Sequence, residues 1–348
     1  MTSILFIGDP HFQITNIPEV DLFIEKITVY AQEHKPQLIC IAGDVLHTHE
    51  KIHTTVLNKA YTLVNNLRIH SPVYILVGNH DYINNRQYLT DSHWMCGMKD
   101  WEGVTVVDKV TKLTLNNYTF VFVPYVPPGR FVEALDTLVG GWKDADCIFA
   151  HQEFCGCKMG AITSIEGDKW PQDYPHVVSG HIHSKQQPQD NIYYPGSSLQ
   201  VAFGESENNI VAMLTFTDTA YPYDLNEVDL GLPKKKIVYM KLDDIDTYTP
   251  PTDNPECVKV TLKGDFNEFK TLKKSKKYKS LVDSGIKVVF KANPTKNPVV
   301  KIDTMNTSGT FSDILQTIVT NKKDKYLNQM YESIINNKEV DLDDILFL

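Results

Sequence analysis

Short apolar runs alternate with amphipathic stretches through the first part of the 348-residue chain. Ile4–Ile7, Leu38–Ala42 and Val73–Val77 have the continuous apolar character of buried strands. Between them, Val20–Gln32 and Thr54–Leu67 carry apolar residues at helical spacing. Later runs indicate strands at Val104–Val107, Thr119–Val123, Cys147–Ala150, Val177–Ser179, Ile192–Tyr194 and Ile210–Phe216, and a helix near Phe131–Leu138. The alternation is typical of βαβ units and predicts an α/β sandwich with a sizeable sheet.

A change of pattern divides the chain near Leu232. Asp218–Pro233 is rich in turn residues and shows no clear period. Beyond it, the Lys-rich segment Phe266–Leu281 predicts a helix, and Phe311–Asn336 has apolar residues at helical spacing. Strands are predicted at Ile237–Leu242, Val258–Leu262 and Ile286–Lys291. We therefore predict a main domain over 1–231, a small α+β domain over 232–303 and a helical region over 304–348 that ends in an acidic and apolar tail.

The net charge of -9 argues at first against a nucleic-acid partner, because phosphate contacts are normally made by Lys and Arg. The charge is segregated, since residues 232–301 hold 16 Lys against 8 Asp and Glu, a balance of +8 that leaves -17 for the rest. No apolar run approaches the roughly 20 residues that span a bilayer, so no membrane association is expected. The six cysteines lack the spacing of a zinc ribbon or a disulfide framework, which fits a cytoplasmic protein.

Five short polar clusters each follow a predicted strand. They are Asp9-Pro10-His11, Gly43-Asp44, Gly78-Asn79-His80-Asp81, His151 and Gly180-His181-Ile182-His183. Side chains at the carboxyl ends of neighbouring strands converge on one crevice in an open α/β sheet. The clusters supply imidazole nitrogens with carboxylate and amide oxygens, a mixture that suits Mn²⁺, Fe²⁺ or Zn²⁺ better than Mg²⁺ or Ca²⁺. A lone histidine at a strand end is more often structural than a ligand, but so many in one ordered set favour a metal site.

In these clusters the chain resembles the calcineurin-like metallophosphoesterases, whose signature is Asp-x-His, Gly-Asp, Gly-Asn-His-Asp or Glu, a lone His, and Gly-His-x-His. All five elements occur in the first two thirds of the chain. The resemblance implies two sheets flanked by helices, and two divalent cations. One cation would be held by Asp9, His11, Asp44 and His183, and the other by Asp44, Asn79, His151 and His181. His80 is the implied general acid for the leaving alkoxide, with Asp81 orienting its ring.

The ligands cannot distinguish a nuclease from a protein phosphatase or a nucleotide hydrolase, because all three share them. Three further features resemble the SbcD-like DNA repair nucleases. They are Gly43–His47, the segment Tyr194–Gln200 followed by Phe203-Gly204-Glu205, and the basic module after residue 232. In that branch a histidine three residues after the aspartate helps to place the scissile phosphate, which gives this role to His47. The alternative is a histidine that simply caps a helix.

Two details depart from that branch, and several histidines and cysteines match none of its motifs. Pro10 occupies a position where bulkier residues are common in these nucleases, and the chain is short, like phage-encoded relatives. The remaining histidines match no cluster and are expected to be structural; they are His49, His53, His93 and His176. Cys155 and Cys157 are expected to be ordinary thiols rather than a metal site.

A run of lysines in the predicted helix of the small domain is the candidate DNA-binding face. It comprises Lys273, Lys274, Lys276, Lys277 and Lys279. Lysine runs are often simply solvated, but in the SbcD family a small capping domain grips duplex DNA, which favours phosphate contacts here.

The resemblance also implies partners. Relatives form homodimers through helices that correspond to about Thr54–Leu67 and Asn85–Met98. They bind an SbcC-like SMC-type ATPase through C-terminal helices, a role for Phe311–Asn336 whose alternative is packing on its own domain. The tail Val340–Leu348 resembles the C-terminal sliding-clamp peptides of phage replication proteins.

We therefore expect a Mn²⁺-dependent DNA exonuclease and endonuclease that acts on double-stranded DNA ends in the cytoplasm, or in the host cytoplasm if phage-encoded. Two alternatives remain open. One is another phosphoesterase of the same superfamily, and the other is a scaffold that has lost catalysis, which missing ligands would favour.

Overall fold

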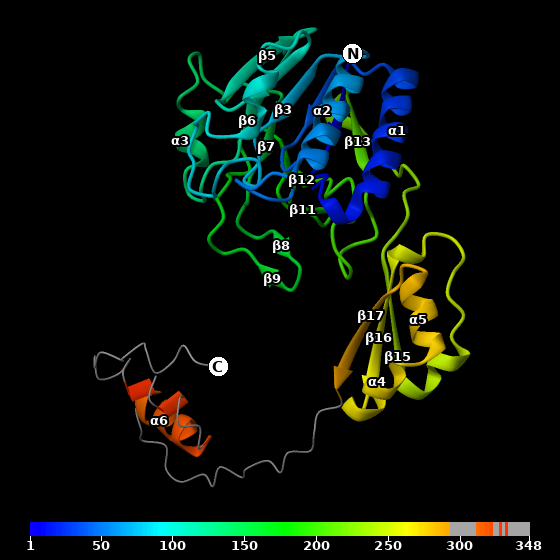
Figure 1. Cartoon of the computed structure of the whole chain (residues 1–348). Helices are drawn as coiled ribbons and strands as arrows, with labels where there is room; N and C mark the ends of the chain where they lie inside the picture. The colour runs from blue at the N-terminus through cyan, green and yellow to red at the C-terminus, as the bar shows by residue number, and fades with distance from the viewer. Residues whose placement is uncertain (293–310, 323–326, 329–330, 333–348) are drawn as a thin grey trace. The chain divides into compact units, whose positions relative to one another are not determined.

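Two six-stranded sheets form the main part of the computed structural model (Figure 1). The model describes residues 1–292, 311–322, 327–328 and 331–332. The chain divides into two compact units, Met1–Lys291 and Ala292–Leu348. The predicted sandwich of two sheets flanked by helices is confirmed. The predicted domain boundaries at 231 and 303 stay predictions.

The first sheet has the order β14-β13-β1-β2-β3-β4. Its strands are β1 (Thr2–Ile7), β2 (Leu38–Ile41), β3 (Val73–Leu76), β4 (Val104–Val107), β13 (Val211–Thr217) and β14 (Ala220–Val228). β1 to β4 run parallel, whereas β13 runs antiparallel to β1 and to β14. The parallel strands therefore all end at the same edge of this sheet.

The second sheet has the order β11-β12-β10-β7-β6-β5. Its strands are β5 (Thr111–Leu115), β6 (Tyr118–Val123), β7 (Cys147–His151), β10 (Val177–Gly180), β11 (Gln186–Gln189) and β12 (Ile192–Tyr194). The four inner strands are parallel, and β5 and β11 are antiparallel edges.

Strand β1 shows why the sheets stack. Ile4 and Phe6 belong to the core between the two sheets, where the Phe6 and Phe149 rings stack with centroids 6.1 Å apart. Leu5 and Ile7 point to the opposite face and pack under α1 (Ile17–His34) and α2 (Thr54–Arg68). With both faces buried, the strand reads as a continuous apolar run. The helix α3 (Phe131–Leu135) contributes Phe131 to the core on the outer face of the second sheet.

The strands that the apolar pattern missed lie at sheet edges. We predicted no regular structure for Asp218–Pro233, but β14 occupies Ala220–Val228. β5 and β11 were missed in the same way, and their residues are half-buried or exposed rather than buried. An edge strand pairs with only one other strand and has a face exposed to solvent. It therefore lacks the long apolar run that is typical of the central strands.

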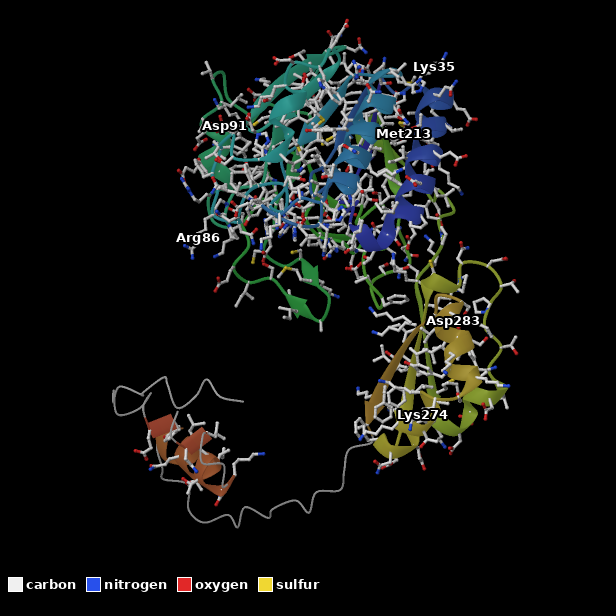
Figure 2. The ribbon with its side chains drawn as sticks, viewed as in Figure 1. Lys35, Arg86, Asp91, Met213, Lys274 and Asp283 are labelled. Atoms are coloured by element: carbon white, nitrogen blue, oxygen red, sulfur yellow. The ribbon has the colours of Figure 1, made fainter. Side chains whose placement is uncertain are left out.

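Residues 236–292 form a small three-stranded sheet with two helices. The strands are β15 (Lys236–Lys241), β16 (Val258–Gly264) and β17 (Lys287–Ala292), in the order β15-β16-β17. The predicted single helix over Phe266–Leu281 is wrong, because two helices form, α4 (Phe266–Leu272) and α5 (Lys276–Asp283). Ser275 separates them, since its side chain accepts a hydrogen bond from Tyr278 N and caps α5. Figure 2 labels Lys274 in the turn between them and Asp283 at the end of α5.

The remaining elements are short. They are β8 (Lys158–Met159), β9 (Ile162–Thr163), α6 (Phe311–Asn321) and the 3₁₀ helices Ile14–Asn16, Trp94–Met98, Leu242–Thr247 and Pro255–Cys257. Among the described residues, no helix has the length and apolar character needed to cross a bilayer.

Candidate metal centre

The carboxyl ends of five strands carry the predicted ligands. The first sheet contributes Asp9 and His11 after β1, Asp44 after β2 and Asn79 after β3. The second sheet contributes His151 at the end of β7, and His181 and His183 after β10. All seven side chains lie close together. The His and Asp residues among them form groups in which the possible ligand atoms lie within 4.8 Å of one another.

The first group contains Asp9, His11 and His183. His11 Nε2 lies 2.8 Å from His183 Nε2, so the two rings present nitrogens to the same point. Asp9 and His11 are buried, at 0% and 1% exposed, and His183 is half-buried. This is a ring-nitrogen and carboxylate set of the kind that binds a transition metal.

Asp44 joins the first group to the second. Its Oδ2 lies 3.5 Å from His11 Nε2 and 3.4 Å from His151 Nε2. Its Oδ1 accepts a hydrogen bond of 2.8 Å from the backbone N–H of His80, which fixes the carboxylate plane. One carboxylate therefore faces both sets of nitrogens, as a bridging ligand must.

The second group contains Asp44, His151 and His181, with Asn79 among them. Asn79 Oδ1 lies 3.0 Å from His151 Nε2 and 2.9 Å from His181 Nδ1. The other ring nitrogen of His151, Nδ1, donates to the carbonyl of Ala42 at 2.7 Å. That hydrogen bond leaves Nε2 as the nitrogen directed at the ligand group.

The protonation states of the buried Asp and His side chains are compatible with bound cations. Burial raises the pKa of Asp9 to about 6, and neither of its buried carboxylate oxygens has a hydrogen-bond partner among the described residues. Burial would also raise the pKa of Asp44, but the charge of His151 outweighs it and lowers that pKa. Burial opposes protonation of His151, yet Asp44 and Asp9 raise its pKa to about 9. Burial and the charge of His151 lower the pKa of His181 to about 3. The unpartnered carboxylate oxygens of Asp9, beside the neutral ring of His181, are donors that fit divalent cations.

The backbone at the ligands is unusual. Asp9, His11, Asp44 and His181 have positive φ values of 21°, 45°, 48° and 79°. Residues other than glycine rarely enter this region, although Asp, Asn and His do so more readily than most. Each such residue costs on the order of 1–3 kcal/mol. The hydrogen bond of 3.0 Å from His11 N to the carbonyl of Asp44 holds two of these turns together.

Glycines allow the ligand loops to approach closely. A Cβ on Gly78 would overlap with the Asp44 carboxylate. A Cβ on Gly180 would lie 2.5 Å from Asp9 Oδ1. Any side chain at these two positions would therefore push a predicted ligand out of place.

The family model described as "Calcineurin-like phosphoesterase" matches residues 2–214. The chain belongs to this family. "Putative phosphoesterase 078R" of Invertebrate iridescent virus 3 is 45% identical over 337 residues, 96% of each chain. "Putative phosphoesterase 244L" of Invertebrate iridescent virus 6 is 49% identical over 279 residues, 79% of this chain and 98% of that protein. The solved structure of YfcE, a phosphoesterase from E. coli, aligns at a TM-score of 0.34 and 14% identity, covering 66% of this chain and 94% of that one.

Calcineurin-like phosphoesterases are metal-dependent hydrolases that use divalent metals, and the His and Asp cluster described above fits that chemistry. The two viral relatives come from viruses of invertebrates, whereas the short chain had suggested phage-encoded nucleases.

The structure corrects one predicted contact of this phosphoesterase centre. The ring of His80 is not held by Asp81, because His80 Nδ1 donates to the carbonyl of His47 at 2.7 Å. The Asp81 carboxylate instead accepts from Gly78 N at 3.0 Å and from Trp94 Nε1 at 2.8 Å. Asp81 therefore stabilises the loop that carries His80 and does not touch its ring.

His47 lies beside two other histidine rings of the centre. Its ring centroid is 5.3 Å from that of His11 and 5.7 Å from that of His80. Its Nδ1 is buried and has no hydrogen-bond partner in the described ranges of the chain, and burial lowers the pKa of the ring. A role in placing phosphate stays a prediction.

Two residues at the centre were not predicted. Glu205 Oε1 lies 3.1 Å from His183 Nδ1, and this hydrogen bond orients the ring. His49, which we expected to be structural, stacks on His80 with centroids 4.9 Å apart and an interplanar angle of 8°. Glu205 follows the Tyr194–Gln200 segment that resembles SbcD, but that motif does not say what the carboxylate contacts. No spacing rule identifies His49.

The predicted DNA-binding lysines lie on the small module. Lys273 and Lys274 follow α4, and Lys276, Lys277 and Lys279 lie on α5. Four of them are exposed, while Lys277 Nζ donates to the carbonyl of Tyr248 at 2.6 Å. Lys277 thus has a structural hydrogen bond, and DNA contact by the other four stays a prediction.

The segments predicted to bind partners are only partly described. α2 forms as expected, but the helix predicted over Asn85–Met98 is wrong, since only Trp94–Met98 is helical. Asn84 Oδ1 accepts from Arg86 N, a local turn that competes with helix formation. α6 covers the start of Phe311–Asn336, and the tail Val340–Leu348 lies outside the described residues.

Proposed function

We propose that this chain is a Mn²⁺-dependent DNA phosphodiesterase, the nuclease subunit of an SbcCD-like recombination and repair complex. The observation that carries the hydrolase part of this proposal is the convergence of two ligand groups on Asp44. The first cation would be held by Asp9, His11, Asp44 and His183, and the second by Asp44, Asn79, His151 and His181.

Divalent cations, when bound, supply Lewis acidity toward the phosphoryl oxygens of the ester. The chain supplies the proton. Because Nδ1–H of His80 donates to the His47 carbonyl, the doubly protonated ring would give the proton on Nε2 to the leaving oxygen and become the neutral imidazole. The stacked His49 ring and the edge of His11 limit rotation of the His80 ring.

Three features support DNA as the substrate. The motif Gly43–His47 places His47 beside the ligands, and the segment after Tyr194 supplies Glu205 to His183. The basic excess of +8 over residues 232–301 would offset the repulsion between an acidic chain and a polyanion. The four exposed lysines of the run are available for phosphate contacts.

The partners belong to the same proposal. We infer a homodimer that uses α2, an SMC-type ATPase that binds the Phe311–Asn336 region, and double-stranded DNA ends as the substrate in the cytoplasm. A sliding clamp would bind the tail Val340–Leu348, and deletion of that tail should abolish clamp pull-down.

The test compares linear duplex DNA with p-nitrophenyl phosphate in the presence of Mn²⁺. The proposal expects end-dependent cleavage of the DNA, stimulated by an ATPase that co-purifies. A His80→Ser variant purified in the same way controls for contaminating nucleases. Hydrolysis of the small ester without any cleavage of DNA would support another phosphoesterase activity instead. Loss of both activities in the full chain would support a scaffold.

A further inference from the structure

A small hairpin presents an apolar face to solvent near the metal centre. Strands β8 and β9 pair antiparallel, with Met159 opposite Ile162. Gly160 has a φ of 62°, which lets two residues close the turn. Directly opposed residues of an antiparallel pair project from the same face. Met159 is 39% exposed and Ile162 is 68% exposed, so this face carries two apolar side chains in water.

The base of the hairpin is firmly attached to the second sheet. Lys158 N donates to Gln186 Oε1 at 2.7 Å, and Gln186 Nε2 donates to the Lys158 carbonyl at 2.9 Å. Ser164 N donates to the carbonyl of the buried Cys157 at 2.8 Å. The strands are thus held on both sides, and the exposed apolar face is a built feature rather than a loose loop.

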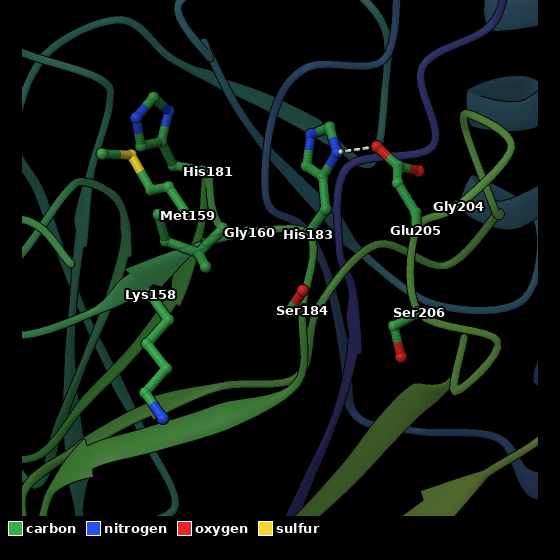
Figure 3. Close-up of a pocket in the computed structure, with 10 residues that line it drawn as sticks. Lys158, Met159, Gly160, His181, His183, Ser184, Gly204, Glu205 and Ser206 are labelled. Atoms are coloured by element: carbon green, nitrogen blue, oxygen red, sulfur yellow. Dashed lines mark hydrogen bonds and ion pairs between the residues drawn. The ribbon is translucent and has the colours of Figure 1, made fainter. Parts of the chain in front are cut away.

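This hairpin forms one wall of a cavity that opens onto the predicted ligands. The cavity has a volume of about 420 Å³ and is lined by Lys158, Met159 and Gly160 together with His181 and His183. Figure 3 shows the Met159 side chain extending toward His181, with Glu205 and Ser206 across from the hairpin. A phosphoester bound at His181 and His183 would therefore have its neighbouring group beside Met159.

We propose that the β8–β9 hairpin is a subsite for an unpaired nucleotide adjacent to the scissile phosphate. The base lies on the face formed by Met159 and Ile162, and Lys158 Nζ contacts a flanking phosphate. This inference rests on the proposed DNA phosphodiesterase function.

The chemistry of the lining favours this occupant. The flat face of a base is apolar and polarisable, and a flexible thioether adapts to it. Such a face is available only when the base is unstacked, because a paired base is covered by its neighbours. Among the described residues that line this cavity, Lys158 is the only lysine, and a single ammonium suits one phosphate. The hairpin thus selects single-stranded or frayed ends over intact duplex.

The experiment uses the full-length, Mn²⁺-loaded chain and two substrates that share a backbone. One is a short oligothymidylate, and the other is an oligonucleotide of the same length in which every nucleotide is abasic. The Met159→Ser, Ile162→Ser double variant is compared with Ile165→Ser. Ile165 is 81% exposed in the same loop but follows β9 and is outside the hairpin pair of Met159 and Ile162, so it is the matched control.

The double variant should lose about fivefold in kcat/KM on the oligothymidylate, which is the lower end of the range for a base stacked on an aromatic side chain, because Met and Ile have no ring. It should cleave the abasic strand at the parental rate. Lys158→Gln should slow both substrates equally, because both contain the phosphate. Equal loss on the two strands in the double variant, or no loss on either, overturns the subsite. A parental enzyme that cleaves neither strand but hydrolyses p-nitrophenyl phosphate refutes the nuclease function itself, which is a different result.

Discussion

Replacing Asp9 by Asn should make the metal-free protein more stable while it weakens metal binding. The Asp9 carboxylate is fully buried, and within the part of the chain that the structure describes both its oxygens lack hydrogen-bond partners. Its charge is therefore disfavoured in the folded chain unless a cation is present. His151 Nδ1, at 3.6 Å from Asp9 Oδ1, offsets part of this cost. In the variant the His151 ring keeps Asp44 as a partner, because its Nε2 lies 3.4 Å from Asp44 Oδ2.

The size of the effect follows from the pKa of Asp9. Burial raises that pKa from its usual 3.8 to about 6. A carboxyl whose pKa is raised by folding costs no stability below pH 3.8, and the cost is complete above about pH 6. The rise in the pKa of Asp9 therefore lowers the free energy of unfolding by roughly 3 kcal/mol at pH 8. At ~2 °C per kcal/mol for a large domain, the variant should unfold roughly 6 °C above the parent in the metal-free state.

The assay is thermal unfolding followed by circular dichroism, in EDTA at pH 8 and pH 4 and again with Mn²⁺. The gap between Asp9→Asn and the parent should be present at pH 8 and close at pH 4. Excess Mn²⁺ should stabilise the parent by about 2.7 kcal/mol at a hundredfold excess over Kd, and the variant by much less. Asp144→Asn, at an exposed carboxylate, is the control and should show neither effect. A variant that is less stable than the parent in EDTA at pH 8 would refute the reasoning.

Two further changes test other parts of the centre, and a third tests the pairing of Asp108 with Lys99. Glu205→Gln should weaken Mn²⁺ binding, measured by calorimetry, by about 10-fold because His183 loses its carboxylate partner; unchanged affinity would remove its positioning role. His80→Ala should keep both cations by metal analysis but lose DNA cleavage by about 100-fold or more, and full activity would exclude it as the acid. Burial would raise the pKa of Asp108, but the hydrogen bond from Lys99 outweighs burial and lowers that pKa. The ionised Asp108 carboxylate therefore stabilises the fold above the usual pKa of an Asp, and this stabilisation is lost when acid protonates it. Asp108→Asn should therefore lower the melting temperature at pH 7. The melting temperature of the variant should also decrease less than that of the parent between pH 7 and pH 3. A variant whose melting temperature depends on pH as the parent's does would contradict this.

Much of the fold could be predicted because the parallel strands of both sheets are buried on both faces. Ile4–Ile7 and Leu38–Ala42 are continuous apolar runs for this reason, and their positions match β1 and β2. The convergence of the ligands could also be predicted, since Asp9 and Asp44 follow neighbouring parallel strands. Edge strands such as β14 could not, because a half-solvated strand has no such run.

The contacts around the ligands were harder to predict. A backbone carbonyl, that of His47, holds the His80 ring, and no residue type in the sequence identifies a backbone acceptor. Glu205 reaches His183 from another loop, 22 residues later in the chain. Such contacts depend on how loops cross, which periodicity does not describe.

The left-handed backbone at Asp9, His11, Asp44 and His181 restricts how the centre can be re-engineered. Asp, Asn and His tolerate that conformation better than most residues. Few residue types can therefore replace these ligands. A softer, thiolate-rich centre would place Cys where the main chain disfavours it. Changing which metal this enzyme selects is therefore a task of loop redesign rather than of side-chain exchange.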